Sequence, residues 1–339
     1  MTEPLLSIRD LRVAYTVGDR TVTAVDGASF DVPHGTIVGL VGESGCGKTT
    51  LARALTRVLA DNAAITGGTA TFNGRDIVAL RERAMNDLRW REIAFIPQSA
   101  MNSLDPVYTV ASQLEEVLCR RGGYSRRAAR ARSEELFEMV GLESNRLDNY
   151  PHQFSGGMRQ RVAIALALAL NPKLIIADEP VTALDVIVQR QILDQLRDLQ
   201  RQLGISVILV THDISVVAYI CDRTVVMYAG HVTESGTMAE TLTEPVHPYT
   251  MGLKNAFPDL RGAAGELTPI EGAPPDLADP PPGCRFAARC PFAEPRCRTH
   301  LPPLIELTPG HAAACHRSGQ AAQLRARATR PGTWTAVSA

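Results

Sequence analysis

Apolar and polar positions alternate along the first part of the chain and merge into short apolar runs further on. Between residues 5 and about 31, the alternation in "LRVAY", "VTAV" and "ASFDV" predicts antiparallel strands with one buried face. The runs "TIVGLV" (36–41), "KLIIA" (173–177) and "SVILV" (206–210) are nearly continuous. Such runs are typical of strands that are buried on both faces, as in parallel sheets.

Amphipathic stretches lie between these runs. A period near 3.6 residues predicts helices at 48–59, 126–140, 161–170 and 188–203. Strands that alternate with helices indicate an α/β domain with a mainly parallel sheet.

The pattern changes after about residue 258. From there to residue 309 the chain is rich in proline, as in "EGAPPDLADPPPG", and shows little helix or strand periodicity. This composition predicts a linker or a small loop-built extension at 259–317. The last residues, 318–339, offer little to pack, so we expect a disordered tail.

Composition and charge narrow the class of protein. The chain has 339 residues, enough for two domains, and its net charge of −1 provides no basic field for nucleic acid. The longest apolar run, "VAIALALAL", is far shorter than the roughly 20 residues that span a bilayer. The first residues lack a signal-peptide pattern. We therefore expect a soluble cytoplasmic protein that reaches a membrane only through a partner.

The stretch "GESGCGKTT" follows a buried strand and precedes a helix, which is the context that a phosphate-binding loop requires. Its glycines let backbone N–H groups face phosphates, and the helix N-terminus favours an anion. Lys48 would reach the β- and γ-phosphates and Thr49 would hold Mg²⁺. The expected nucleotide-binding residues of this loop are Gly42, Glu43, Ser44, Gly45, Cys46, Gly47, Lys48, Thr49 and Thr50.

Two acids end a second buried strand in "LIIADEP". The carboxyl ends of strands form the crevice in which open α/β sheets bind ligands. We expect Asp178 to hold Mg²⁺ and Glu179 to act as a base or to orient the attacking water.

Further elements complete an ordered set. "FIPQ" ends at Gln98, "FSGGMRQR" spans 154–161, "ALD" ends at Asp185, and "VTHD" contains His212. With the phosphate loop and "LIIADEP", they resemble the ATP-binding cassette family over about residues 5–258. The resemblance implies a phosphate-loop ATPase core with an antiparallel β subdomain and a helical subdomain at about 99–165, in a domain spanning 1–258.

The "FSGGMRQR" stretch is similar to the family signature, which faces ATP held by an opposite subunit. Ser155, Gly156 and Gly157 would contact that nucleotide in trans, and Asp185 would lie at the dimer interface. The signature opens with phenylalanine instead of leucine and continues with methionine instead of glutamine. Neither change removes the serine or the glycines.

The resemblance also implies roles for single side chains. Gln98 would bind Mg²⁺ and sense the attacking water, and His212 would contact the γ-phosphate. Tyr15 matches the aromatic that stacks on adenine, although an ordinary strand aromatic is the alternative. We expect a competent ATPase with four catalytic residues, Lys48, Gln98, Glu179 and His212.

Three more stretches, "SAMNSLDPVYTV", "ICDRTVVMYAGHVTESG" and "EPVHPYTMGL", precede the proline-rich extension. Together with the extension they resemble ATPase subunits of dipeptide and oligopeptide importers, and nickel and glutathione importers share much of the pattern. The resemblance implies a second ATPase subunit, favouring a paralogue, with two transmembrane permeases and an extracytoplasmic binding protein. The chain would act at the cytoplasmic face of the membrane.

Other cassette functions fit less well. Cassettes that act on DNA or ribosomes usually need a second cassette or a long coiled coil, and exporters lack this kind of extension. A non-hydrolysing partner is disfavoured by the intact Glu179 and His212.

Four of the seven cysteines, Cys284, Cys290, Cys297 and Cys315, form a C-x5-C-x6-C-x17-C pattern. Disulfides are disfavoured in a reducing cytosol, and unliganded thiols would hold a loop-rich segment poorly. Zinc is an alternative, with His300, His311 or His316 as further ligands, but its cysteine pairs are usually closer. Peptide-importer ATPases with this pattern resemble proteins that carry a [4Fe–4S] cluster. We therefore expect that cluster, in a structural or redox-sensing role.

Overall fold

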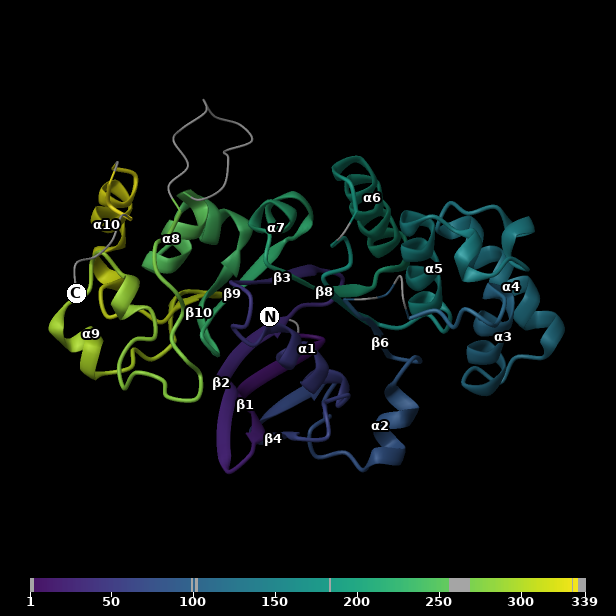
Figure 1. The fold of residues 1–339 in the computed structure, drawn as a ribbon, viewed down its shortest axis with the longest axis horizontal. Helices are drawn as coiled ribbons and strands as arrows, with labels where there is room; N and C mark the ends of the chain where they lie inside the picture. Colours follow the sequence, from purple (N-terminus) through teal and green to yellow (C-terminus); the bar gives the residue numbers. More distant parts are fainter. Residues whose placement is uncertain are drawn as a thin grey trace. The chain divides into compact units, whose positions relative to one another are not determined.

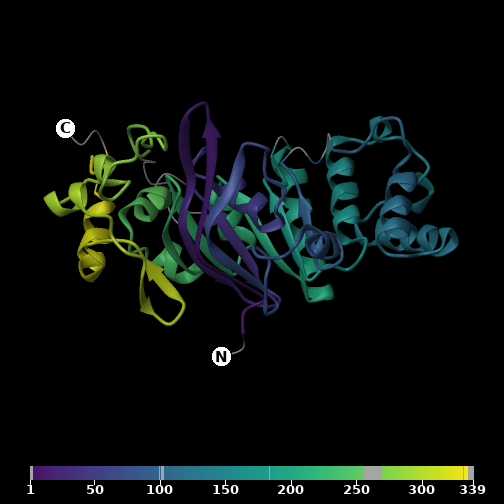
Figure 2. The ribbon, with the colours of Figure 1, turned by 90° about the horizontal axis from the view of Figure 1, so that it is seen from below.

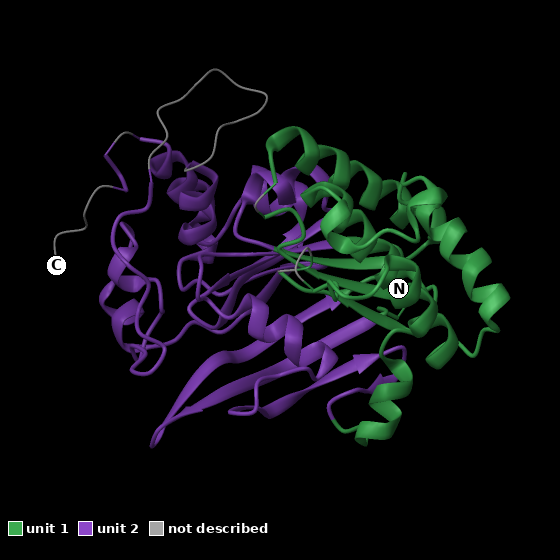
Figure 3. Cartoon of the chain, turned by 45° about the vertical axis from the view of Figure 1, so that its right-hand side comes forward, with its two compact units in different colours: residues 1–5, 32–37, 79–210 green, residues 6–31, 38–78, 211–339 purple. Residues whose placement is uncertain are grey.

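The computed structural model describes residues 3–98, 100, 103–182, 184–255, 269–330 and 332–334. The chain divides into two compact units (Figure 3). The first comprises Met1–Leu5, Val32–Ile37 and Ala79–Val210, and the second comprises Leu6–Asp31, Val38–Val78 and Thr211–Ala339.

The second unit contains the predicted antiparallel sheet. Its order is β2-β1-β4-β5, and Figure 2 shows the long β1–β2 hairpin in purple. The strands are β1 (Leu6–Val17), β2 (Arg20–Val32), β4 (Ala63–Phe72) and β5 (Arg75–Asp76). Alternate residues of β1 are buried, as the pattern predicts. The pairing of β1 with β4 shifts between Arg9 and Arg12, where Asp10 adopts a left-handed φ of 51°.

A second set of strands in this unit carries the first apolar run. Strand β3 (Ile37–Val41) is buried throughout and pairs in parallel with β9 (Arg223–Tyr228). Antiparallel pairing then continues through β10 (His231–Thr237), β12 (His311–Ala313) and β11 (Ile305–Thr308). The helices of the unit are α1 (Lys48–Thr56), α7 (Ile214–Ile220), α8 (Pro248–Asn255), α9 (Pro295–Thr299) and α10 (Ala321–Ala328) (Figure 1).

The first unit contains the remaining buried strands. Strands β6 (Ile93–Ile96), β7 (Leu174–Asp178) and β8 (Ser206–Thr211) run parallel in the order β8-β7-β6. The helices are α2 (Glu82–Leu88), α3 (Val110–Arg120), α4 (Arg126–Met139), α5 (Gly156–Leu168) and α6 (Val186–Leu203). Helices α3, α4 and α5 pack against one another, as a helical subdomain requires. Ser99, Met101 and Asn102 of that predicted segment lie outside the described residues.

Helix boundaries follow from local chemistry. The Ser125 Oγ atom accepts a hydrogen bond from the N–H of Ala128 and so begins α4. Gly204, with a φ of 63°, ends α6 in the left-handed conformation that glycine favours. The helix predicted at 161–170 begins earlier, at Gly156, because Ser155 caps it. No helix in the part of the chain that the structure describes is long and apolar enough to cross a bilayer.

The prediction of a linker or a loop-built extension is wrong for residues 305–313, which form two strands. Strands β11 and β12 form a hairpin, and β12 pairs with β10 through Glu234 and Ala313. These strands are too short for a sequence period, and an existing strand edge supplies their pairing partner. The extension therefore belongs to the same compact unit as the phosphate loop and does not form a unit of its own after residue 258. Residues 256–268 lie outside the described residues.

The prediction of a disordered tail is wrong for the described part of 318–339. Helix α10 buries Ala321, Leu324 and Ala328, whose spacing puts them on one helix face. Trp334 is also buried, and its Nε1 atom donates to the carbonyl of Ala328 at 2.9 Å. A few apolar side chains at helical spacing are thus enough to pack this segment. Residue 331 and residues 335–339 of the predicted tail lie outside the described residues.

Candidate functional site

The predicted phosphate loop joins β3 to α1 in the second unit, and two of its glycines have no room for a side chain. A Cβ atom on Gly42 would stand 2.1 Å from the carbonyl oxygen of Met227. A Cβ atom on Gly47, where φ is 100°, would stand 2.2 Å from the carbonyl oxygen of Ala24. The strongly curved loop backbone approaches its neighbours this closely, and for that reason only glycine fits at both positions.

The ammonium group of Lys48 lies against this loop and is buried. Its Nζ atom donates to the carbonyl oxygens of Gly42 at 2.7 Å and Glu43 at 2.8 Å. The curve of the loop therefore surrounds a fixed positive charge next to the N-terminus of α1. Backbone N–H groups, a helix N-terminus and an ammonium group together form an arrangement suited to phosphate.

Tyr15 lies beside the end of the same loop. Its hydroxyl forms a 3.0 Å hydrogen bond with Thr50 Oγ1, in which either atom can be the donor. The structure thus brings a β1 aromatic to the phosphate loop. Stacking of Tyr15 on adenine stays a prediction.

The predicted acidic pair ends β7 in the first unit. Asp178 is fully buried. Glu179 adopts a left-handed φ of 48°, and its backbone N–H donates to Val210 O at 2.8 Å. A non-glycine residue rarely takes this conformation, and such positions gather at functional sites.

The structure brings Gln98 and Glu179 together. The Gln98 Nε2 atom donates to Glu179 Oε2 at 2.8 Å, and Thr182 Oγ1 donates to the same oxygen at 3.0 Å. One carboxylate oxygen is thereby fixed by two donors. Thr182 is a residue that the sequence patterns do not single out.

The predicted signature opens helix α5 in the same unit. The Ser155 Oγ atom accepts from the Met158 N–H at 3.4 Å, and Ser155 itself is exposed. A Cβ atom on Gly157 would stand 2.6 Å from Val188 Cγ1, so glycine lets α5 approach α6. The first turn of α5 therefore lies at the surface, with Gly156 and Gly157 half-buried.

Asp185 begins helix α6. Its Oδ1 atom accepts from the N–H groups of Ile187 at 3.1 Å and Val188 at 3.0 Å, which explains its place as a helix cap. The next two side chains, Val186 and Ile187, are 80% and 72% exposed. The predicted dimer role of Asp185 stays a prediction. Ala183, which begins the "ALD" stretch, lies outside the described residues.

His212 is exposed and lies between β8 and α7, where the Asp213 carboxylate caps α7. It belongs to the second unit with the phosphate loop, whereas the acidic pair, Gln98 and the signature belong to the first. Within each unit, the local geometry of these residues suits the roles predicted for them.

Comparison with known proteins identifies the chain's relatives. The ABC transporter family model matches residues 25–182, and a model of the C-terminal region of oligopeptide/dipeptide transporters matches residues 233–297. The oligopeptide transport ATP-binding protein OppD of Salmonella typhimurium is 47% identical over 92% of this chain and 93% of that protein. The chain belongs to the family of ATP-binding subunits of peptide ABC transporters. The dipeptide transport ATP-binding protein DppD of Bacillus subtilis is 44% identical over 95% and 97% of the two chains.

Solved structures share the fold of this ABC ATP-binding subunit. A dimeric ATP-binding cassette in a post-hydrolysis state, bound to ADP and Pi, is 29% identical with a TM-score of 0.62, over 69% of this chain and 98% of that chain. CbiO1 from Clostridium perfringens is 27% identical with a TM-score of 0.61, over 72% and 92% of the two chains. The predicted recognition as a cassette ATPase subunit of the peptide-importer family is confirmed.

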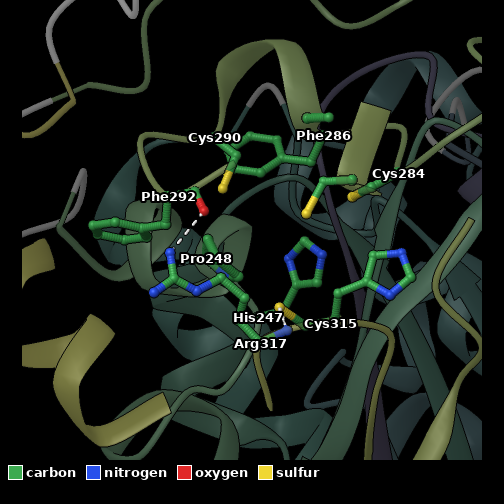
Figure 4. A pocket seen from close by; sticks show the side chains of 11 residues that line it. His247, Pro248, Cys284, Phe286, Cys290, Phe292, Cys315 and Arg317 are labelled. Atoms are coloured by element: carbon green, nitrogen blue, oxygen red, sulfur yellow. Dashed lines mark hydrogen bonds between the residues drawn. The ribbon is translucent and has the colours of Figure 1, made fainter. Parts of the chain in front are cut away.

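The four cysteines of the extension line one small cavity of about 20 Å³, together with His247, Phe286 and His316. Figure 4 shows the side chains of Cys284, Cys290 and Cys315 around this cavity. We call it the cysteine pocket. All four thiols are free of disulfides. The structure therefore brings together residues that are 31 positions apart in the sequence, from Cys284 to Cys315.

Burial governs the chemistry of these thiols. It raises the pKa of Cys284 and Cys290, and it raises the pKa of Cys315 to about 11. Neighbouring thiols add to the rise, because Cys290 is close enough to feel the charge of Cys284, Cys297 and Cys315. Four neighbouring thiols become thiolates readily only when a cation compensates the charge.

Among the described residues, no group of side chains is arranged to hold a metal ion. Within residues 3–255 and 269–334, apart from the undescribed positions, no group of three or more His, Cys, Asp or Glu side chains could hold one metal ion. Neither the predicted [4Fe–4S] cluster of Cys284, Cys290, Cys297 and Cys315 nor its zinc alternative is therefore confirmed. The Mg²⁺ site of Thr49, Gln98 and Asp178 stays a prediction.

A buried ion pair holds the extension to β10. Glu234 is fully buried and accepts from the N–H groups of Val246 and His247 at 2.8 and 2.9 Å. Its third contact is His311 Nε2, at 3.0 Å, from strand β12. The hydrogen bond to Glu234 raises the pKa of His311 above its ordinary value of 6.5. No sequence pattern predicts the pair of Glu234 and His311, and His311 was considered only as a possible zinc ligand.

We expect this pair to make stability depend on pH. Since the pKa of His311 is higher in the folded protein, its stabilisation is complete below the unfolded value of 6.5 and is lost as pH rises through the folded value. Urea unfolding at several pH values should show that the free energy of unfolding falls as the pH rises from 6.5 through the folded pKa of His311. The His311→Gln variant should show a smaller fall over the same pH range. The control is His152→Gln, at an exposed histidine. An equal pH slope in His311→Gln and in the unaltered protein would contradict this role.

Proposed function

We propose that this chain binds and hydrolyses ATP to drive the import of dipeptides or oligopeptides through a membrane complex. The observation that carries the substrate class is the C-terminal region, which matches the oligopeptide/dipeptide transporter model at 233–297. The relatives OppD and DppD, named for oligopeptide and dipeptide transport, match this chain nearly end to end. Nickel or glutathione import is the alternative within the same subfamily.

In this proposal the phosphate loop binds the nucleotide. Lys48 turns from the carbonyl groups of Gly42 and Glu43 to the β- and γ-phosphates, and Tyr15 contacts adenine. His212 contacts the γ-phosphate and fixes its position, so that catalysis is mostly positioning and charge stabilisation. Bound Mg²⁺ would neutralise phosphate charge, with Thr49, Gln98 and Asp178 as its protein partners.

Glu179 then acts on the attacking water. Its carboxylate either accepts the proton of this water or orients it for attack on the γ-phosphate. Gln98 and Thr182 each donate to one oxygen, Oε2, and so hold the side chain in one orientation. Fixed donors of this kind reduce the reorganisation needed when charge develops.

The working unit would be a pair of ATPase subunits. The exposed N-terminal turn of α5, with Ser155, Gly156 and Gly157, would face the nucleotide held by the other subunit. The exposed Val186 and Ile187 beside Asp185 suit burial in such an interface. The second subunit would be a paralogue, and the complex would include two permeases and an extracytoplasmic binding protein. The pair would act at the cytoplasmic face of the membrane.

For the cysteine pocket we propose a [4Fe–4S] cluster held by Cys284, Cys290, Cys297 and Cys315. The proposal is supported by the donor set, because four thiols that form no disulfide line one cavity. In such a cluster each thiolate binds a different iron, so the sulfurs stand around a cube and need not converge on one point. Zinc is the alternative, and it would need ligands that converge on one point. The cluster, when bound, would supply positive iron centres that keep the thiols ionised.

We expect protein purified without oxygen to show the broad visible absorption of an iron–sulfur cluster and about four iron atoms per chain. Cys290→Ser should lose both signals, since it removes one of four ligands. Cys119→Ser is the matched control, because Cys119 lies on α3 outside the cysteine pocket. A colourless protein with stoichiometric zinc would contradict the cluster.

Uptake by cells tests the transport proposal. In cells that lack this chain, expression of the unaltered protein should restore uptake of labelled dipeptides or oligopeptides, whereas the Glu179→Gln variant should not. Labelled nickel and labelled glutathione are tested in parallel. Restored uptake of either one without peptide uptake would favour the alternative over the proposal.

A further inference from the structure

Arg289 connects the cysteine-rich segment to the phosphate loop. It directly precedes Cys290 in the sequence, and its side chain is only 7% exposed. Its Nη1 atom donates to both carboxylate oxygens of Glu43, at 3.0 and 2.8 Å, and to the hydroxyl of Tyr228 at 3.1 Å. Glu43 is the second residue of the phosphate loop, so an arginine of the extension holds a side chain of the nucleotide site.

The rest of the guanidinium is anchored in the extension. Its Nε atom donates to the carbonyl of Glu271 at 3.0 Å, and its Nη2 atom donates to the carbonyl of Ile270 at 3.1 Å. All three guanidinium nitrogens are therefore engaged, and the planar group has one fixed orientation. Because the carbonyl groups fix the guanidinium on one side, the position of the Glu43 carboxylate on the other side depends on the backbone of the extension.

Glu43 passes this constraint on to the catalytic lysine. Its backbone N–H donates to Tyr249 Oη at 3.0 Å, and its carbonyl oxygen accepts from Lys48 Nζ at 2.8 Å. The side chain, the amide and the carbonyl of one loop residue are thus all held. The shape of the loop at Glu43, and with it the resting place of the Lys48 ammonium, depends on Arg289.

Aromatic packing links the same contact to the cysteine pocket. The ring of Phe286 lies 5.2 Å from Tyr228 and 5.3 Å from Tyr249, measured between centroids. The Arg289 guanidinium carbon lies 5.9 Å from the Phe286 centroid. Phe286 is itself a wall of the cysteine pocket, as Figure 4 shows. Phe286 therefore contacts the residues that position Glu43 and also lines the cysteine pocket.

We propose that Arg289 is a positioning residue for nucleotide binding, which holds the phosphate loop at Glu43 and makes its shape depend on the cysteine pocket. This inference rests on the proposed role of the loop in binding ATP. Backbone N–H groups bind phosphate only when the loop is already curved correctly. Without Arg289, the Glu43 carboxylate loses its ionic partner and the loop gains conformations that do not bind phosphate.

The first test separates nucleotide affinity from turnover. We expect Arg289→Met to raise the Kd and KM for ATP by about tenfold, the effect of losing a hydrogen bond to a charged group, with kcat at saturating ATP within about twofold. Arg289→Lys keeps the charge but not the planar fork, so its Kd should lie between those of the unaltered protein and Arg289→Met. The double variant of Glu43→Gln and Arg289→Met should bind ATP no more weakly than Arg289→Met alone, because the two residues act on one contact.

A matched control distinguishes positioning from general loosening of the extension. Arg325 on α10 donates to the carbonyl groups of Glu244 and Pro245, at 3.3 and 3.1 Å, without contact to the loop. Arg325→Met should therefore lower the unfolding midpoint without changing the Kd for ATP. An unchanged Kd in folded Arg289→Met, or equal changes in Arg289→Met and Arg325→Met, would overturn the proposal. If Arg289→Met does not fold, Arg289→Lys and Glu43→Gln carry the same comparison.

The link to the cysteine pocket has its own test. Cys290→Ser should raise the Kd for ATP in the unaltered background but add little in the Arg289→Met background, because the effect passes through Arg289. Equal effects of Cys290→Ser in both backgrounds would overturn the link. Lys48→Ala separates this result from the proposed function. Full ATP binding in that variant would contradict the role of the loop itself, whatever Arg289 does.

Discussion

Replacing Glu179 with glutamine is expected to lower ATP turnover by about 100-fold or more while ATP affinity stays within about twofold. Glutamine preserves the size of the side chain but cannot accept a proton. The carboxylate is held by Gln98 and Thr182, which both donate to Oε2. Turnover is measured as phosphate release at saturating ATP, and affinity is measured by nucleotide titration.

A control for Glu179→Gln comes from the same unit. Glu116 is exposed on α3 and pairs with Arg120 at 3.0 Å, so Glu116→Gln removes one carboxylate without touching the predicted site. Its ATP turnover should be unchanged. If Glu179→Gln also keeps full turnover, the role assigned to Glu179 is wrong.

The second large effect is expected for Lys48→Ala, which should weaken ATP binding by about 100-fold or more, because the buried charge proposed to face phosphate is lost. A ligand that binds only the folded state raises the melting temperature of the protein. ATP with Mg²⁺ should therefore raise the Tm of the unaltered protein and leave that of Lys48→Ala unchanged.

Loss of Lys48 also removes the donor to the carbonyl groups of Gly42 and Glu43, so the Tm without ATP should fall as well. The shift caused by ATP, and not the starting Tm, is therefore the readout. Lys173→Ala is the control, at a half-exposed lysine paired with Glu92. A normal ATP-dependent shift in Lys48→Ala would show that the nucleotide binds elsewhere.

The sequence predicted the parts of this protein that depend on local chemistry. A continuous apolar run, a glycine-rich turn and a helix follow one another at the phosphate loop, and each is visible within ten residues. The structure adds the reason that Gly42 and Gly47 are needed, since the carbonyl groups of Met227 and Ala24 leave no space for a Cβ atom. Those neighbours are distant in the sequence and cannot be anticipated from the motif.

The parts that were missed depend on partners from distant segments. Strand β12 has only three residues, and it exists because β10 offers an edge and Glu234 offers an acceptor for His311. Helix α10 forms in a segment with few apolar residues because those few lie on one face. No sequence pattern singles out Arg289, because its contact with Glu43 joins residues that are 246 positions apart.

The most direct test is ATP hydrolysis by a reconstituted complex of this chain with the proposed partner ATPase, permeases and binding protein. Hydrolysis should rise when the binding protein carries a dipeptide or oligopeptide, and the Glu179→Gln variant should abolish that rise. Stimulation by nickel or glutathione with none by peptide would contradict the assigned substrate class. Stimulated hydrolysis that persists in Glu179→Gln would contradict the assigned chemistry.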